Sequence, residues 1–462
     1  MSDGHILNKN ILRAYDIRGV VGDSLNEKDA EVIGKVFASL VNFDDKSKVV
    51  VCRDGRLSSP KLAKALIAGL KFSGANVIDI GLGPTPMLYF ASHHFQAEGA
   101  IMITGSHNPS EYNGFKFMLG KDSFFGEDIL NLGERAKSGI WDDNKAGTVI
   151  SKSIERQYID TLINATNIGD IKKNIKVAWD SGNGATGNIL SKLVSFLPNE
   201  NILLNSVIDG NFPAHHPDPT DPKNLLQLIN FVKANNFNLG VAFDGDGDRV
   251  GVVTGTGRII LGDQILALLS RTVLKNLPGA QIITDVKASE ILNKEIDKLG
   301  GNLVVWKTGH SFIKAKMKEI KAPLAGEVSG HIFFSDRYFG YDDGLYAALR
   351  ILECIKDEKY LDNFLDSLPK TFCTPEIRIE CSDERKFEIV DKVRNELENS
   401  GLEINKIDGI RVKYSFGWWL LRASNTQNAL VVRMEANSKE YLDFIKSELQ
   451  KYISPYGLKI NI

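Results

Sequence analysis

Three aspartates at alternate positions give the sequence its clearest sign of metal chemistry: Asp244, Asp246 and Asp248 in the stretch DGDGDR. The glycines between them let the backbone turn tightly, so three carboxylates can converge on one cation, and hard oxygen ligands suit Mg²⁺. A calcium loop of the EF-hand type does not fit, because Arg249 is at the sixth position and Gly255 at the twelfth, where that loop needs glycine and glutamate. The apolar runs LGVAF and VGVVT flank the stretch, which disfavours a plain acidic surface turn.

One serine, Ser106, follows the strand-like run GAIMI in the stretch TGSHNPSEYNGFK. A Mg²⁺ ion held by three carboxylates takes further oxygen ligands, commonly from phosphate. A phosphoryl group on Ser106 would complete such a site, so Ser106 is predicted as metal ligand and phosphoryl carrier. A serine hydrolase is disfavoured, because His107 is the adjacent residue, whose side chain we expect to point away, and no G-x-S-x-G motif occurs. A mere turn is the remaining interpretation of the stretch.

Two further polar stretches suit an anionic sugar. In GEVSGH, Glu327 and Ser329 offer an acceptor and a donor for sugar hydroxyls, and His331 can change protonation near neutrality. The stretch RASNTQN gathers hydrogen-bond donors that match a phosphate. These donors are Arg422, Ser424, Asn425 and Thr426.

Other chemistries fit the sequence less well. Residues 182–187, GNGATG, match the dinucleotide pattern G-x-G-x-x-G, but no acidic residue clearly ends the following NILLNSV run, and no P-loop motif is present. The four cysteines lack CxxC spacing and are interpreted as reduced. The histidine pairs 93–94 and 215–216 are adjacent, unlike the i, i+4 ligands of a helical zinc site.

The loops recur within a repeated pattern. Three times a β-branched run ends at an aspartate, at Asp54, Asp180 and Asp285. An amphipathic stretch follows each, then a second apolar run (VIDIG, NSVIDG or LVVWKTG), and then a third strand ending in TGSHNP, DGDGDR or GEVSGH. This alternation predicts α/β units with largely parallel sheets. Ligands bind at the carboxyl ends of such strands, so the three loops are expected to converge on one cleft.

The length of 462 residues exceeds what one hydrophobic core supports, and four domains are predicted. Three similar α/β domains with mixed, largely parallel sheets span residues 1–150, 151–255 and 256–370. From residue 371 the pattern changes to alternating strands with a terminal helix. Residues 371–462 are therefore predicted to form a smaller α+β domain.

Bulk composition excludes several partners. The net charge is -2 and no long basic run appears, so nucleic acid is not expected to bind. No stretch reaches the roughly 18 apolar residues of a membrane span, and the opening MSDGHILNKN has no apolar signal core. We expect a cytoplasmic protein with no membrane partner.

Seven motifs in order, AYDIRG, TGSHNP, NGFK, DGDGDR, GHSFIK, GEVSGH and RASNT, resemble those of the phosphohexomutase superfamily, most closely its bacterial phosphomannomutase/phosphoglucomutase group. The likeness spans essentially the whole chain. It implies four domains around a central cleft and an isomerase that interconverts hexose 1-phosphate and hexose 6-phosphate, with mannose and glucose as the sugars. It also implies a phosphoserine, one Mg²⁺ ion and a hexose 1,6-bisphosphate that acts as intermediate and activator.

The resemblance assigns roles to residues of this chain. Ser106 is the phosphoserine and, with the three aspartates, a metal ligand; Arg18, Lys116 and His331 join it as catalytic residues, with Lys116 or His331 as general acid/base. The substrate-binding residues that it implies are Tyr15, His107, Arg249, His310, Glu327, Ser329, Arg422, Ser424, Asn425 and Thr426.

Two departures from the family pattern bear on specificity. Val328 replaces the usual methionine of the dual-specificity group and the usual glutamine of phosphoglucosamine mutases, which favours glucose and mannose phosphates over glucosamine phosphate. After RASNT the chain reads QNA rather than the commoner proline-containing sequence, so the sequence does not predict the shape of the far side of that loop. The alternatives are a phosphoglucosamine mutase and a non-catalytic phosphosugar-binding protein, and we expect a monomer.

Overall fold

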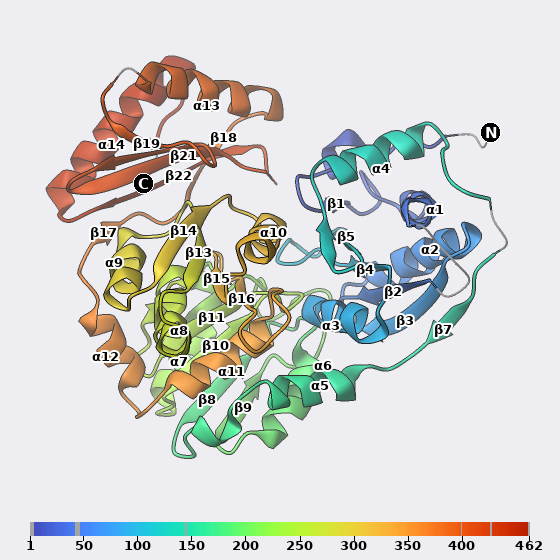
Figure 1. Ribbon diagram of the computed structural model, residues 1–462, viewed down its shortest axis with the longest axis horizontal. Helices are drawn as coiled ribbons and strands as arrows, with labels where there is room; N and C mark the ends of the chain where they lie inside the picture. Colours follow the sequence, from blue (N-terminus) through green and yellow to red (C-terminus); the bar gives the residue numbers. More distant parts are fainter. Residues whose placement is uncertain (1–3, 42–46, 144–145, 399, 426, 461–462) are drawn as a thin grey trace.

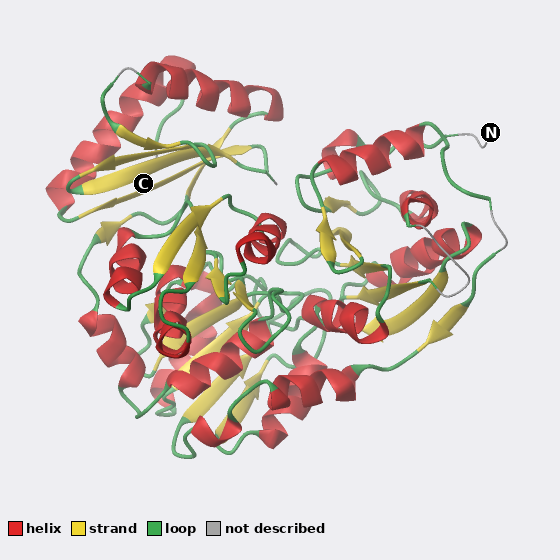
Figure 2. Cartoon of the chain, in the orientation of Figure 1, coloured by secondary structure: helices red, strands yellow, loops and turns green. Residues whose placement is uncertain are grey.

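A computed structural model describes residues 4–41, 47–143, 146–398, 400–425 and 427–460. Four sheets follow one another along the chain, each with helices packed on it (Figures 1 and 2). The N-terminal unit lies across from the C-terminal one, and the two middle units form the base between them (Figure 1).

The first sheet has the strand order β1-β5-β4-β2-β3-β7, with β6 paired to β5. Strands β3, β2 and β4 run parallel, and β5 is antiparallel to β4. Its elements are β1 (Ile17–Val20), α1 (Glu27–Leu40), β2 (Lys48–Arg53), α2 (Ser59–Phe72), β3 (Asn76–Leu82), α3 (Thr85–Phe95), β4 (Gly99–Ile103), β5 (Tyr112–Leu119), β6 (Asp122–Phe124), α4 (Glu127–Lys137) and β7 (Val149–Ser151).

The second sheet repeats this core arrangement in the order β12-β11-β10-β8-β9, with β9, β8 and β10 parallel and β11 antiparallel. The predicted second strand NSVIDG is wrong: the strand lies earlier, at Glu200–Leu204, and NSVIDG belongs to the loop that follows. The elements are α5 (Glu155–Asn164), β8 (Lys176–Asp180), α6 (Gly187–Leu193), β9 (Glu200–Leu204), α7 (Leu226–Ala234), β10 (Leu239–Phe243), β11 (Val250–Thr254) and β12 (Ile259–Ile260).

The third sheet has the same order of four strands, β14-β13-β15-β16. Again the first three are parallel and the last is antiparallel. Its elements are α8 (Gly262–Asn276), β13 (Gln281–Asp285), α9 (Glu290–Lys298), β14 (Asn302–Trp306), α10 (His310–Ile320), β15 (Leu324–Gly326), β16 (Ile332–Phe334), α11 (Gly344–Cys354) and α12 (Tyr360–Ser367).

The fourth sheet is antiparallel, in the order β17-β22-β21-β20-β19 with β18 paired to β22, and helices α13 and α14 cover one face (Figure 2). The mixed α/β class with a smaller α+β unit at the C-terminus is confirmed. The elements are β17 (Phe372–Cys373), β18 (Ile377–Glu380), α13 (Asp383–Leu397), β19 (Glu403–Asn405), β20 (Ile410–Tyr414), β21 (Gly417–Ala423), β22 (Ala429–Ala436) and α14 (Lys439–Ile453).

The common topology places the three unusual loops at equivalent points. Residues 104–111 join β4 to β5, residues 244–249 join β10 to β11, and residues 327–331 join β15 to β16. Each loop therefore leaves the carboxyl end of a parallel strand and enters its antiparallel neighbour. One apolar core runs through the second and third units and includes α3 of the first, which fixes these strand ends relative to one another. No helix within the described ranges is both long and apolar enough to cross a membrane.

Candidate active site

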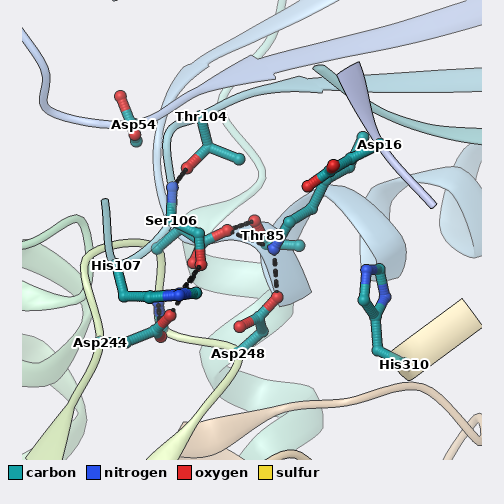
Figure 3. A network of polar contacts seen from close by, with 12 residues as sticks. Asp16, Asp54, Thr85, Thr104, Ser106, His107, Asp244, Asp248 and His310 are labelled. Carbon is teal, nitrogen blue, oxygen red and sulfur yellow. Dashed lines mark hydrogen bonds and ion pairs between the residues drawn. The ribbon is translucent and has the colours of Figure 1, made fainter. Parts of the chain in front are cut away.

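The serine loop presents Ser106 in a conformation that few residues adopt. Its φ is +49°, in the left-handed region, and its backbone N–H donates to Thr104 Oγ1 at 2.7 Å. The Ser106 hydroxyl donates to Asp244 Oδ2 at 3.0 Å, which joins the first unit to the second (Figure 3). The loop thus delivers one hydroxyl to the acidic cluster.

The expectation that the side chains of Ser106 and His107 point apart is wrong. His107 Nδ1 lies 3.2 Å from Ser106 Oγ (Figure 3), because the left-handed serine backbone redirects its side chain. Burial, reinforced by the positive charge of Arg249, lowers the pKa of His107 well below its ordinary value, so the ring is neutral near pH 7. Asp244 contacts the same hydroxyl, which gives the serine an environment unlike that of a serine–histidine hydrolase pair.

A buried arginine, Arg56, holds the serine loop from behind. Its guanidinium donates to Ser106 O at 2.8 Å and to Asn108 O at 2.6 Å, and Asp54 pairs with its Nε at 3.2 Å. Sequence reasoning singled out Asp54 as the end of a strand and missed Arg56, two positions later in the same DGR stretch. The fold buries this charged residue completely, and its neighbours in the sequence give no sign of that burial.

The aspartate triplet forms a buried cluster next to Ser106. Asp244, Asp246 and Asp248 are fully buried, and one oxygen from each lies within 4.8 Å of the others. Lys116 Nζ donates to Asp246 at 2.7 Å and also to Asp248. The second oxygens of Asp246 and Asp248 are buried without a hydrogen-bond partner. Unpaired buried carboxylate oxygens are costly, so this donor set fits a divalent cation.

Burial and the two neighbouring carboxylates raise the pKa of Asp244 well above its ordinary value. Burial alone would lower the pKa of Lys116, but Asp246 and Asp248 outweigh it and hold that pKa above its usual range. Lys116 therefore keeps its proton while both aspartates stay beside it. A cation at the cluster would compete with Lys116 for these carboxylates.

The GEVSGH loop brings His331 to the same cluster. Arg249 Nε donates to His331 Nε2 at 3.0 Å, while His331 Nδ1 lies 2.9 Å from Asp342 Oδ2. Lys314 donates to the other Asp342 oxygen at 3.0 Å. Asp342 thus orients the imidazole, a role that sequence reasoning missed because Asp342 lies beyond the next strand, in the stretch YDDG.

Glu327 and His310 of the third unit both line the site. The Gly309 N–H donates to Glu327 Oε1 at 2.6 Å, and burial raises the pKa of Glu327. The ring of Tyr15 meets His310 edge-on at 5.4 Å between centroids. Burial, with Lys314 nearby, lowers the pKa of His310 well below its ordinary value, so His310 is uncharged near neutrality.

Arg422 stands near the end of β21 and lines the site from the fourth unit. Its side chain is 6% exposed, and its Nε donates to Asp408 Oδ2 at 3.0 Å. Ser424 and Asn425 follow it in the connection to β22, and Thr426 lies outside the described residues. The remaining guanidinium N–H groups suit a phosphate.

A single cavity of about 790 Å³ joins these parts. All four units line it, and the buried aspartates lie behind Ser106 and Lys116 at one end. The predicted site residues that line it are Tyr15, Arg18, Ser106, His107, Lys116, Arg249, His310, Glu327, Ser329, His331, Arg422, Ser424 and Asn425. Lys287 also lines it and pairs with Glu376 at 3.2 Å; sequence reasoning missed this lysine, two residues after Asp285.

The chain matches four family descriptions in consecutive order. Residues 9–135, 156–257 and 261–372 match the phosphoglucomutase/phosphomannomutase alpha/beta/alpha domains I, II and III. Residues 376–451 match the C-terminal domain of the same family.

Relatives match over nearly their full length. The chain is 46% identical to a phosphomannomutase/phosphoglucomutase of Pseudomonas putida, covering 95% of this chain and 94% of that protein. It is 42% identical to a phosphoglucomutase of Neisseria gonorrhoeae, over 97% of each. A crystal structure of a phosphoglucomutase/phosphomannomutase family protein from Burkholderia thailandensis superposes with a TM-score of 0.89 at 40% identity, over 99% of both chains. The chain therefore belongs to the phosphoglucomutase/phosphomannomutase family.

Proposed function

We propose that this protein is an isomerase that interconverts hexose 1-phosphate and hexose 6-phosphate, acting on mannose and glucose phosphates. The observation that carries the proposal is the cavity itself: a hydroxyl backed by three buried carboxylates lines it from the first and second units, and a buried arginine lines it from the fourth. A hexose phosphate fits between them with one end at Ser106 and the other at Arg422.

Ser106, Asp244, Asp246 and Asp248 are the proposed ligands of one Mg²⁺ ion. The family is generally metal-dependent, and the unpaired oxygens of Asp246 and Asp248 support a cation at this cluster. When bound, Mg²⁺ supplies positive charge that offsets the charge on phosphoryl oxygens.

The chain's own residues hold the substrate and move its protons. Arg422, Ser424 and Asn425 bind the phosphate that does not react, and Thr426 is proposed to join them. Glu327 and Ser329 read the sugar hydroxyls, with Tyr15, His107 and His310 closing the cavity around the ring. Arg18 and Arg249 offset charge on the transferring phosphoryl group.

Two groups are placed to move the proton of the attacking hydroxyl. Lys116 contacts Asp246 and Asp248 and would exchange its proton only if a bound cation took its place on these carboxylates. His331 lies between Asp342 on one side and Arg249 on the other. Phosphoserine 106 gives its phosphoryl group to the bound sugar phosphate, which becomes a hexose 1,6-bisphosphate. The bisphosphate turns over in the cavity and returns its other phosphate to Ser106.

We extend the proposal to the whole chain. The four units take the boundaries 1–150, 151–255, 256–370 and 371–462, and hexose 1,6-bisphosphate serves as activator by loading Ser106. One chain supplies every side of the cavity, which supports a monomer as the working form. We place the enzyme in the cytoplasm, where hexose phosphates are made and used.

The test is turnover of glucose 1-phosphate and mannose 1-phosphate by the wild type, by Ser106→Ala, and by Ser110→Ala as the control on the exposed side of the same loop. We expect turnover of both sugars, loss of most of it in Ser106→Ala, and no change in Ser110→Ala. Near-normal turnover by Ser106→Ala would refute the mechanism. Binding without turnover by the wild type would indicate a phosphosugar-binding protein, and preference for glucosamine 1-phosphate would indicate a phosphoglucosamine mutase.

A further inference from the structure

The loop after Arg422 is supported from outside the cavity by a buried lysine. Lys386 lies in the first turns of α13, which packs over the fourth sheet (Figure 1), and its side chain is 2% exposed. Its Nζ donates to Ser424 O at 2.6 Å, to Gln427 O at 2.9 Å and to the Asp383 carboxylate at 2.5 Å. An ammonium group has three N–H donors, so these three acceptors use all of them.

Asp383 connects this lysine to the far side of the loop. With the amide of Asn428 assigned so that its nitrogen faces the carboxylate, that nitrogen donates to the two Asp383 oxygens at 2.9 and 3.0 Å. The backbone carbonyl of Asn428 in turn accepts from the backbone N–H of Cys381 at 3.0 Å. Asn428 belongs to the stretch QNA, in which this chain departs from the commoner proline-containing sequence. Lys386, Asp383 and Asn428 thus form a polar clamp that holds a loop without a proline.

The clamp determines which way the loop's backbone faces. Ser424 and Gln427 line the cavity, whereas Lys386 does not. By collecting the carbonyl oxygens of these two residues behind the loop, Lys386 keeps their partial negative charge away from an anion in the cavity. The Gln427 N–H is held by Ser424 Oγ at 3.1 Å, which closes the turn on itself.

We propose that Lys386, held by Asp383, which Asn428 contacts in turn, is a positioning residue that sets Ser424 and Gln427 of the phosphate-binding loop for substrate. This inference rests on the proposed function, because it assigns Lys386 an effect on phosphosugar binding. Asp383 offsets the charge of Lys386, so the effect comes from geometry rather than from the field of a free cation.

Arg13 extends the clamp to the N-terminal unit. Its Nη1 donates to Asp383 Oδ2 at 3.2 Å, and both side chains are partly exposed. Asp383 therefore contacts groups of both the first and the fourth unit. Substituting Asp383 perturbs the clamp without placing a new charge in the cavity or opening a void in a core.

The experiment measures KM, kcat and the melting temperature of Lys386→Met and Asp383→Asn with glucose 1-phosphate. Lys392→Met is the matched control, because Lys392 lies in the same helix but is 55% exposed, pairs with Glu388 one turn earlier and otherwise lies over the Tyr456 ring at the surface, away from the loop. We expect Lys386→Met to raise KM about tenfold or more and Asp383→Asn to raise it severalfold, while kcat changes less than KM. Lys386→Arg should recover part of the loss, since a guanidinium can also donate to two carbonyls.

The outcomes separate the possible roles. A field effect of the lysine charge would make Asp383→Asn bind substrate more tightly, and that result would overturn the proposal. A KM unchanged in both variants, or a lower melting temperature with an unchanged KM, would also overturn it. If Lys386→Met does not fold, Asp383→Asn decides the matter together with Arg13→Gln, which removes only the Arg13 contact of Asp383 and should leave KM unchanged. A wild type that fails to turn over hexose phosphates would instead refute the proposed function, which the same assay detects first.

Discussion

Replacing Arg422 with lysine should weaken substrate binding more than conservation of charge suggests. In the structure Arg422 is buried, and its Nε already donates to Asp408 at 3.0 Å, so its other N–H groups can serve a phosphate at the same time. A lysine offers one compact ammonium group, which would have to share its donors between Asp408 and the phosphate.

The expected loss follows from the hydrogen bonds involved. A hydrogen bond between charged groups contributes about 1.5 to 3 kcal/mol, and a buried site gives little solvent screening to reduce it. Loss of one such bond corresponds to a rise in KM of roughly 10- to 150-fold. The assay is steady-state conversion of glucose 1-phosphate to glucose 6-phosphate, coupled to a dehydrogenase specific for the product.

Arg385→Lys is the control, because it makes the same substitution at an arginine on the exposed surface of α13. Its KM and kcat should equal those of the wild type. Arg422→Lys with unchanged KM and kcat would refute the placement of the phosphate at this end of the cavity.

Three further results are expected. Chelation of divalent cations should abolish turnover and Mg²⁺ should restore it, because the buried carboxylates repel one another without a cation. Ca²⁺ should support less turnover, because it positions phosphate oxygens less strictly. Full turnover in metal-free buffer would contradict this. Glucose and mannose 1-phosphates should be converted with kcat/KM values within about a hundredfold, since Glu327 and Ser329 can read the O3 and O4 hydroxyls that the two sugars share. Glucosamine 1-phosphate should be a poorer substrate, because Val328 offers it no hydrogen bond. Discrimination of about ten-thousandfold between the epimers would show that another residue reads C2. Burial, with Lys121 nearby, lowers the pKa of His93 to about 4, so its stabilising contribution is present above an unfolded pKa of about 6.5 and is lost as pH falls toward 4. After discounting for its partial exposure, the loss is ~1 kcal/mol, and the melting temperature should fall more between pH 7 and pH 5 in the wild type than in His93→Phe; equal falls would show that His93 does not contribute.

The sequence predicted the elements of the site whose signals are local. The spacing of Asp244, Asp246 and Asp248 and the strands around them are encoded within a dozen residues, so both the loop and its cation chemistry could be inferred. The repeat placed the serine and sugar loops at equivalent strand ends for the same reason, and the three sheets confirm that topology.

Features that depend on tertiary contacts or on an unusual backbone were missed. Arg56 and Asp342 act on groups that lie across the fold, and nothing in their neighbours marks them as buried. The contact of Ser106 with His107 depends on a positive φ at a non-glycine residue, which alternation patterns do not encode. The second strand of the second unit was misplaced because the Val-Ile pair of NSVIDG follows closely on the apolar residues of the strand ENILL, so the end of the apolar run does not mark the end of the strand.

The central claim is that Ser106 carries the phosphoryl group that is exchanged with the sugar. The most direct measurement is mass spectrometry of the intact protein and of its peptides after incubation with glucose 1,6-bisphosphate, and again after a chase with hexose phosphate. The account predicts a gain of about 80 Da, located on Ser106 and lost in the chase, and no gain in Ser106→Ala. A phosphoryl group on another residue, or turnover without any phosphorylated protein, would contradict the account.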